Sequence, residues 1–188
     1  TQWNDTDGDG YGDNASGNRA DDCPSTFGES NKNNTLGCVD SDSDGWADSD
    51  DQFDNESSQW LDTDGDGYGD EFLGFQGDEC KLVAGNSTID RFGCVDSDAD
   101  GYSNNGDAFP NNPTQYLDSD GDGYGNNQSA SATQVDAFPS DGTQWNDTDG
   151  DGHGDNKYGT QGDHFPNNAN RWQDSDEDGY ANEDDAFD

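Results

Sequence analysis

The hydrophobic positions of this chain follow neither of the periods that mark regular secondary structure. No stretch of useful length places apolar residues at helical spacing, and none sustains the alternation of a strand. Glycine, aspartate and asparagine dominate, and these residues favour turns. The pattern predicts a mostly irregular chain with short helical turns at most.

The aromatic residues nevertheless recur at a fixed phase relative to an acidic motif. The motif reads D-x-D-x-D-G, then an aromatic residue or His, then any residue, then Asp or Asn, and it occurs seven times. We number its nine residues as positions 1 to 9. Position 1 is Asp5, Asp40, Asp62, Asp96, Asp118, Asp147 and Asp174. Such recurrence predicts tandem repeats.

The copies fall into two classes that differ in length. Four Gly-rich copies, the long repeats, carry an insertion before a later aspartate, which is Asp21, Asp78, Asp136 or Asp163. Three short repeats reach the corresponding aspartate sooner, at Asp51, Asp107 and Asp185. We call this residue the late Asp. The predicted repeats are 1–36, 37–57, 58–92, 93–113, 114–142, 143–169 and 170–188, and the last is expected to continue beyond the segment.

The motif has the chemistry of a Ca²⁺ loop. Ca²⁺ takes six to eight oxygen ligands, and a glycine at position 6 permits the sharp turn that gathers them. The predicted ligands are the seven position 1 residues, the late Asp residues and the carboxylates of positions 3 and 5, which are Asp7, Asp9, Asp42, Asp44, Asp64, Asp66, Asp98, Asp100, Asp120, Asp122, Asp149, Asp151, Asp176 and Asp178. Position 7 offers its backbone carbonyl, from Tyr11, Trp46, Tyr68, Tyr102, Tyr124, His153 and Tyr180. Position 9 offers its side chain, from Asp13, Asp48, Asp70, Asn104, Asn126, Asp155 and Asn182.

Other metal-loop classes fit less well. An EF-hand needs a flanking helix on each side and a Glu at position 12, whereas here Pro, Gly and Asn flank the motif. Magnesium prefers octahedral sites that retain water. Charge balance favours more than seven calcium ions.

Composition makes the cation close to obligatory. The formal net charge is −39 and only 25% of residues are hydrophobic, so little apolar surface opposes chain entropy. We therefore expect no compact fold without divalent cations. The charge argues against nucleic acid as a partner, and no apolar run is long enough for membrane insertion.

The cysteines and aromatic residues predict joints between repeats. A repeat that ends in Cys is followed by one that begins with Cys, which pairs Cys23 with Cys38 and Cys80 with Cys94. A repeat that ends in Phe is followed by Trp or Tyr, which pairs Phe53–Trp60, Phe109–Tyr116, Phe138–Trp145 and Phe165–Trp172. Trp3 holds the same place before the first motif. We expect disulfides and packed rings to occupy equivalent joints, and the even cysteine count indicates an oxidising compartment. The spacing does not suit a zinc site.

The stretch from Asp40 to Asp51 and the ending Asp21-Asp22-Cys23-Pro24 resemble thrombospondin type 3 repeats, and the resemblance extends over essentially the whole chain. It implies a calcium-wrapped chain with little secondary structure, two ions per repeat, and disulfides between successive repeats. The fold class we expect is an irregular, elongated tandem array of calcium-wrapped Asp-rich loops. The Gly-rich copies are closer in character to bacterial and archaeal surface proteins.

Seven N-x-(Ser/Thr) sequons occur, and those at Asn14, Asn33, Asn86 and Asn127 lie in predicted insertions or joints where a glycan could project. No catalytic constellation is evident. We expect a non-enzymatic, extracellular or cell-surface stalk or fibre, whose partners are neighbouring repeats or identical chains. The alternative is an adhesive module that binds protein or carbohydrate, for which Phe72, Phe75 and Tyr158 are the candidate exposed aromatics.

Overall fold

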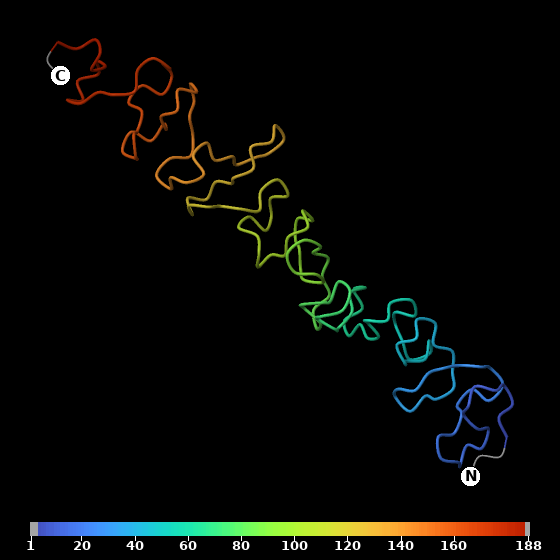
Figure 1. Ribbon diagram of the computed structural model, residues 1–188. Helices are drawn as coiled ribbons and strands as arrows, with labels where there is room; N and C mark the ends of the chain where they lie inside the picture. Colours follow the sequence, from blue (N-terminus) through green and yellow to red (C-terminus); the bar gives the residue numbers. More distant parts are fainter. Residues whose placement is uncertain (1–3, 187–188) are drawn as a thin grey trace. The chain divides into compact units, whose positions relative to one another are not determined.

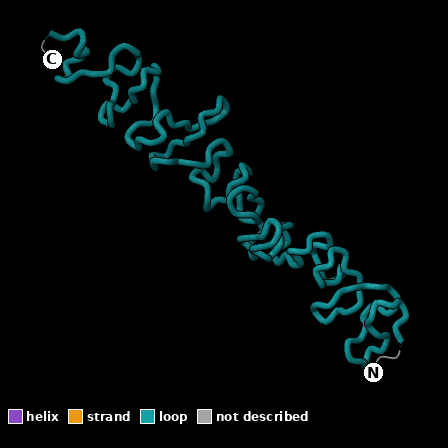
Figure 2. Tube along the Cα trace, viewed as in Figure 1, coloured by secondary structure: helices purple, strands orange, loops and turns teal. Residues whose placement is uncertain are grey.

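The structure, a computed structural model, describes residues 4–186, so Trp3 lies outside the described residues. These residues contain no α-helix and no β-strand. Their only regular pairings are two isolated parallel bridges, Gly12–Ala20 and Gly125–Val135. Figure 2 shows the described backbone as loop throughout. The prediction of an irregular fold is confirmed for this part of the chain.

The chain divides into two compact units, Thr1–Val95 and Asp96–Asp188. The first unit holds the motif loops that begin at Asp5, Asp40 and Asp62, and the second holds the remaining four. Within each unit the backbone turns back on itself repeatedly (Figure 1). Among the described residues, no helix is long and apolar enough to cross a bilayer.

The motif loops curl because two of their residues adopt left-handed backbone conformations. Position 6 is glycine in every copy, with φ between 90° and 102°. Position 4 also has positive φ, but its non-glycine residues, Ser43, Ala99 and Glu177, lie at 59–65°. A residue with a Cβ tolerates φ near 60° at a cost of roughly 1–2 kcal/mol, whereas φ near 100° favours glycine. This explains why position 4 varies while position 6 does not.

The interior of the fold is polar rather than apolar. The fully buried side chains are Gln59, Gln115, Gln144, Asp78, Asp136, Asp163, Ser30, Ser87 and Ser103. Several large apolar side chains are instead exposed, including Leu73 and Leu82. Hydrophobic burial therefore contributes little to the stability of the fold. Its stability depends instead on hydrogen bonds and on how the charge of its buried carboxylates is offset.

The buried glutamines hold the insertions of the long repeats. The Gln115 Nε2 donates to the carbonyls of Asn127 (3.0 Å) and Thr133 (3.1 Å), and its Oε1 accepts from the Asn127 N–H (2.8 Å). Gln59 and Gln144 make the same three bonds in their own repeats. A Cβ added to Gly125, at position 8, would overlap the Gln115 side chain. The buried glutamine of a long repeat thus requires glycine at position 8, because the two residues pack directly against each other.

The insertions return to the same point whatever their length. In the four long repeats the late Asp N–H donates to the position 8 carbonyl, as in Asp78 N to Gly69 O (2.8 Å) and Asp136 N to Gly125 O (2.9 Å). In the short repeats a tight turn spans this distance, closed by Asp50 N to Ala47 O (2.7 Å) in one copy. Both classes therefore bring the late Asp back to its own loop.

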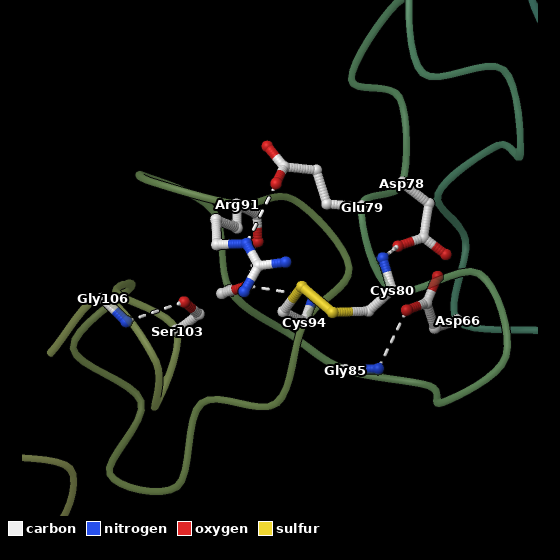
Figure 3. Close-up of a disulfide and its surroundings, with 10 residues drawn as sticks. Asp66, Asp78, Glu79, Cys80, Gly85, Arg91, Cys94, Ser103 and Gly106 are labelled. Atoms are coloured by element: carbon white, nitrogen blue, oxygen red, sulfur yellow. Dashed lines mark hydrogen bonds and ion pairs between the residues drawn. A yellow bond between two sulfur atoms is a disulfide. The ribbon is translucent and has the colours of Figure 1, made fainter.

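Both predicted disulfides, Cys23–Cys38 and Cys80–Cys94, are present, each with a Cα–Cα distance of 5.1 Å. The buried Ser87 supports the second bond, because its Oγ accepts from the Cys94 N–H (3.0 Å) and donates to the Arg91 carbonyl. An ion pair between Arg91 and Glu79 lies beside it (Figure 3). The disulfides indicate a non-reducing environment.

The aromatic pairing was predicted incorrectly. Each joint ring stacks on the position 7 ring of the preceding loop, rather than on the Phe seven residues before it. The pairs are Trp46–Trp60, Tyr102–Tyr116, Tyr124–Trp145 and His153–Trp172, with centroids 4.2–5.8 Å apart. The physical reason is that turns fold the joint back, as when the Glu56 N–H donates to the Phe53 carbonyl and the Gln52 N–H to the Trp60 carbonyl.

The disulfide and aromatic joints are also less equivalent than predicted. In the disulfide joint of the third repeat, the position 7 ring of Tyr68 pairs with Phe92, two residues before Cys94 (centroids 5.8 Å apart). The Glu79 N–H donates to the Phe92 carbonyl, as the Gln52 N–H does to Trp60. Phe92, rather than Cys94, therefore holds the structural place of Trp60, and the disulfide is an additional link.

Candidate metal centre

Each motif loop is closed by the side chain at position 9. In the loop of Asp40, the Asp48 Oδ1 accepts from the Ser41 N–H (2.8 Å) and its Oδ2 accepts from the Ser41 hydroxyl (2.7 Å). The Asp48 N–H also donates to the carbonyl of Val39 (2.8 Å), just before the loop. These bonds tie the two ends of the nine-residue loop together.

The same closure recurs with asparagine. The Asn126 Oδ1 accepts from the Ser119 N–H (3.1 Å), and its Nδ2 donates to the Ser119 hydroxyl (2.6 Å). The position 9 residues, predicted as ligands, therefore serve loop closure with the Ser or Thr at position 2. They are Asp13, Asp48, Asp70, Asn104, Asn126, Asp155 and Asn182.

The position 1 carboxylate organises the interior of the loop. The Asp62 Oδ1 accepts from the Gly65 N–H (2.7 Å) and its Oδ2 from the Gly67 N–H (2.8 Å). These two donors are the residues at positions 4 and 6, whose left-handed conformation aims their N–H groups inward. The carboxylate thereby fixes the curl that brings positions 1, 3 and 5 together.

The carboxylates at positions 1, 3 and 5 converge closely enough to share an ion. In each group, one oxygen from each residue lies within 4.8 Å of the others. Five such groups are Asp5–Asp7–Asp9, Asp40–Asp42–Asp44, Asp62–Asp64–Asp66, Asp96–Asp98–Asp100 and Asp118–Asp120–Asp122, and two further groups of acidic, His or Cys residues meet the same criterion. The local sequence pattern thus produces the predicted oxygen clusters.

The decisive feature is a set of buried carboxylate oxygens that have no hydrogen-bond donor in the described structure. Except for Asp174 at position 1, their residues occupy position 3, position 5 or the late position. They are Asp7, Asp9, Asp21, Asp42, Asp44, Asp64, Asp78, Asp98, Asp120, Asp122, Asp136, Asp149, Asp151, Asp163 and Asp174. Asp64 and Asp120 leave both oxygens without a donor. A buried carboxylate oxygen without a partner costs several kcal/mol, which a bound cation removes.

The late Asp completes each cluster. Asp78 is fully buried, and one of its oxygens accepts from the Cys80 N–H (2.5 Å) while the other has no donor. Burial raises the pKa of Asp78, the Cys80 N–H opposes that shift, and the charges of Asp66 and Asp64 raise it further. Figure 3 shows Asp66 and Asp78 together beside Cys80. The late Asp therefore faces positions 3 and 5 of its own loop.

The same electrostatic signature appears in both classes of repeat. In the short repeats, the pKa of Asp51 and Asp107 is raised mainly by burial and then by the charges at positions 5 and 3. The same causes raise the pKa of Asp21, Asp136 and Asp163 in the long repeats. In each case the backbone N–H two residues after the late Asp opposes the shift. The insertions therefore leave the position of the late Asp relative to its own loop unchanged.

The donor set fits a hard divalent cation. It consists of carboxylate oxygens, and the position 7 carbonyls of Trp46, Tyr68 and Tyr124 accept no backbone hydrogen bond within the described residues. These carbonyls remain able to contribute a neutral oxygen, which suits Ca²⁺. His153, also at position 7, stacks on Trp172 through its ring, with centroids 4.5 Å apart.

The sequence matches no protein-family model and no curated protein.

The predicted glycosylation residues have different environments. The Asn127 Nδ2 donates to the Thr114 carbonyl (2.7 Å), and the Asn33 Nδ2 donates to the Asp50 carboxylate (3.3 Å). The Asn14 Oδ1 accepts from the Ser16 N–H (3.1 Å), and Asn86 is exposed. Asn127 and Asn33 thus use in folding the nitrogen to which a glycan would be attached.

Proposed function

We propose that this chain is a calcium-binding structural segment of an extracellular protein, in which a tandem array of calcium-wrapped loops forms a stalk or fibre. The observation that carries the proposal is the set of buried carboxylate oxygens without donors at positions 3, 5 and late. Their regular recurrence distinguishes them from the solvated carboxylates of an acidic linker. The resemblance to thrombospondin type 3 repeats implies a calcium-wrapped chain with little secondary structure.

The proposed ligands of each loop are the carboxylates at positions 1, 3 and 5, the position 7 carbonyl and the late Asp. When bound, calcium supplies positive charge that offsets repulsion among these carboxylates. The side chain at position 9 contributes indirectly, because it holds the loop closed. More than seven ions are expected, since Asp64 and Asp120 each have two buried oxygens without donors. We propose no catalytic activity.

Links between successive loops support a structural role. The Gln52 N–H donates to the Trp60 carbonyl (3.2 Å), and its Oε1 accepts from the N–H of Asp62 (2.6 Å), the first ligand of the next loop. Trp60 also stacks on Trp46 of the preceding loop, with centroids 5.8 Å apart. Contacts between neighbouring repeats of this kind are what a stacked array requires.

Isothermal titration calorimetry of the metal-free segment with calcium tests the proposal. We expect more than seven ions per chain, and magnesium at equal concentration should bind more weakly. Terbium luminescence, sensitised by the rings at position 7, provides a second readout. Binding of only one or two ions, or equal affinity for magnesium, would refute the calcium array.

A second candidate function, adhesion to protein or carbohydrate, is favoured by the insertion of the third repeat. Phe72, Leu73 and Phe75 are 59%, 93% and 62% exposed. The backbone of Phe75 is nevertheless held in place, because Gln59 Nε2 donates to the Phe75 carbonyl (3.1 Å) and the Phe75 N–H donates to Ser58 Oγ (2.8 Å). Replacement of Phe72 and Leu73 by Ser should abolish ligand retention on protein or glycan arrays while calcium stoichiometry stays the same.

A further inference from the structure

The sequons of the chain differ in whether folding occupies their reactive groups. Transfer of an oligosaccharide requires a reachable Asn Nδ2 and a Ser or Thr two residues later. In the sequons of Asn4 and Asn146, the Nδ2 donates to the position 9 carboxylate of the same loop, Asp13 or Asp155, and so does the Thr hydroxyl. In these two sequons, loop closure therefore uses both reactive groups.

Two further sequons are engaged elsewhere, one in an insertion and one in a joint. The Asn127 Nδ2 is held by the Thr114 carbonyl, in the network that anchors the insertion to Gln115. In the sequon of Asn33, both the Nδ2 and the Thr35 hydroxyl donate to Asp50. Modification at Asn127 would break a bond that anchors the insertion of its own repeat, and modification at Asn33 would break a bond between the first and second repeats.

The sequon Asn55-Glu56-Ser57 is different. Asn55 and Ser57 are both exposed, and neither side chain makes a hydrogen bond to any other residue between positions 4 and 186. Asn55 lies in a turn closed by Glu56 N to Phe53 O (2.8 Å). The side-chain hydrogen bond beside this turn involves neither Asn55 nor Ser57, because it joins the Ser58 hydroxyl, as donor, to the Glu56 carboxylate (2.7 Å). The turn is therefore ordered without using either reactive group of the sequon.

There is also space for a sugar. An open hollow of about 330 Å³ lies beside Asn55 and is lined by Gln52, Phe53, Asp54, Asn55 and Glu56. The corresponding turn of the next Phe joint, Pro110-Asn111-Asn112-Pro113, has no usable sequon because Pro follows Asn112. This joint thus combines an exposed turn, adjacent space and an acceptor sequence.

We propose that Asn55 is an N-glycosylation site of the folded protein. The donor is an oligosaccharide linked through a diphosphate to a lipid. The Asn55 Nδ2 forms a bond to C1 of the first sugar, the bond from C1 to the diphosphate oxygen breaks, the lipid diphosphate leaves, and a transferase base takes the amide proton. The disulfides place the chain in a non-reducing environment, where such transfer takes place. The inference goes beyond calcium binding and concerns Asn55, which is not one of the proposed calcium ligands.

The test uses the calcium-loaded chain with intact disulfides, a purified oligosaccharyltransferase that requires only the sequon, and its lipid-linked donor. Peptide mapping by mass spectrometry then gives the occupancy of each sequon. Asn55 should be modified at least about tenfold more than Asn127 and Asn146. After reduction and chelation, the difference should fall to less than about threefold.

Two variants and a matched control complete the design. Asn55→Gln and Ser57→Ala should each remove the dominant glycopeptide from the folded protein, whereas Asn146→Gln should leave it unchanged. Near-ultraviolet circular dichroism verifies folding of every sample. Equal occupancy at Asn127 or Asn146 in the folded state would overturn the proposal. So would an Asn55 that stays unmodified in the folded chain.

Discussion

The partnership between Gln115 and Gly125 permits a sharp test of how the long repeats are built. In Gly125→Ala, the new Cβ would overlap the Gln115 side chain, which is fully buried. Gln115 would have to leave its site and lose three hydrogen bonds. At about 0.5–1.5 kcal/mol for each bond, the insertion should lose about 2–4 kcal/mol of local stability.

The matched control is the same substitution in a Gln115→Ala background. Short repeats already carry Ala47 and Ala181 at position 8, and their motifs have Gly37 and Arg171, not glutamine, three residues before position 1. Without Gln115, therefore, Gly125→Ala should be neutral or should stabilise by about 0.4–1 kcal/mol. The coupling energy between the two sites should reach about 2 kcal/mol or more.

Native-state hydrogen exchange of the Asp136 amide measures this coupling, because that N–H donates to the Gly125 carbonyl (2.9 Å) in the parent chain. In calcium, Gly125→Ala alone should speed its exchange at least about thirtyfold, which corresponds to about 2 kcal/mol. In the Gln115→Ala background, the same substitution should change it less than about threefold. Equal acceleration in both backgrounds would refute the steric argument.

Three further predictions concern the loops. Asp48→Asn should change calcium affinity less than about threefold, because Asn closes other loops in the same way. Asp44→Asn should lower calcium affinity about tenfold or more, because Asp44 has a buried carboxylate oxygen without a donor. Calorimetry distinguishes the two results. Gly123→Ala (φ 91° at position 6) should cost about 1 kcal/mol more in thermal unfolding than Gly121→Ala (φ 82° at position 4), since position 4 accepts other residues elsewhere. Burial and neighbouring charges raise the pKa of Asp78 and Asp136 above 3.8, so ionisation of these carboxylates destabilises the metal-free fold. The metal-free fold should therefore gain stability as pH falls through the raised pKa. Over the same pH range, calcium titrations at stepped pH should show a decreasing affinity, because protons occupy the ligands.

The local parts of the fold could be predicted from the sequence because local chemistry decides them. Glycine at position 6 and aspartate at positions 1, 3 and 5 were enough to predict the curl and the oxygen cluster. The cysteine pairing followed from the repeat phase alone.

The misread features depend on contacts that spacing does not reveal. The role of Asp48 as a ligand stays a prediction, and the Ser or Thr at position 2 of every motif is the sequence signal for its part in loop closure. Trp60 pairs with Trp46, fourteen residues away, because a folded turn removes its nearer neighbour Phe53. Gln59 was missed, although a Gln stands three residues before every long motif. The sequence feature that could have revealed Gln59 is that this Gln occurs only in repeats with glycine at position 8.

The central claim is that divalent cations hold this chain in its fold, and near-ultraviolet circular dichroism tests it most directly. The stacked pairs Trp46–Trp60 and Tyr124–Trp145 should give a strong aromatic signal in calcium. With the disulfides intact, excess chelator should abolish most of that signal, and added calcium should restore it. An aromatic spectrum that is unchanged by the chelator would contradict the account.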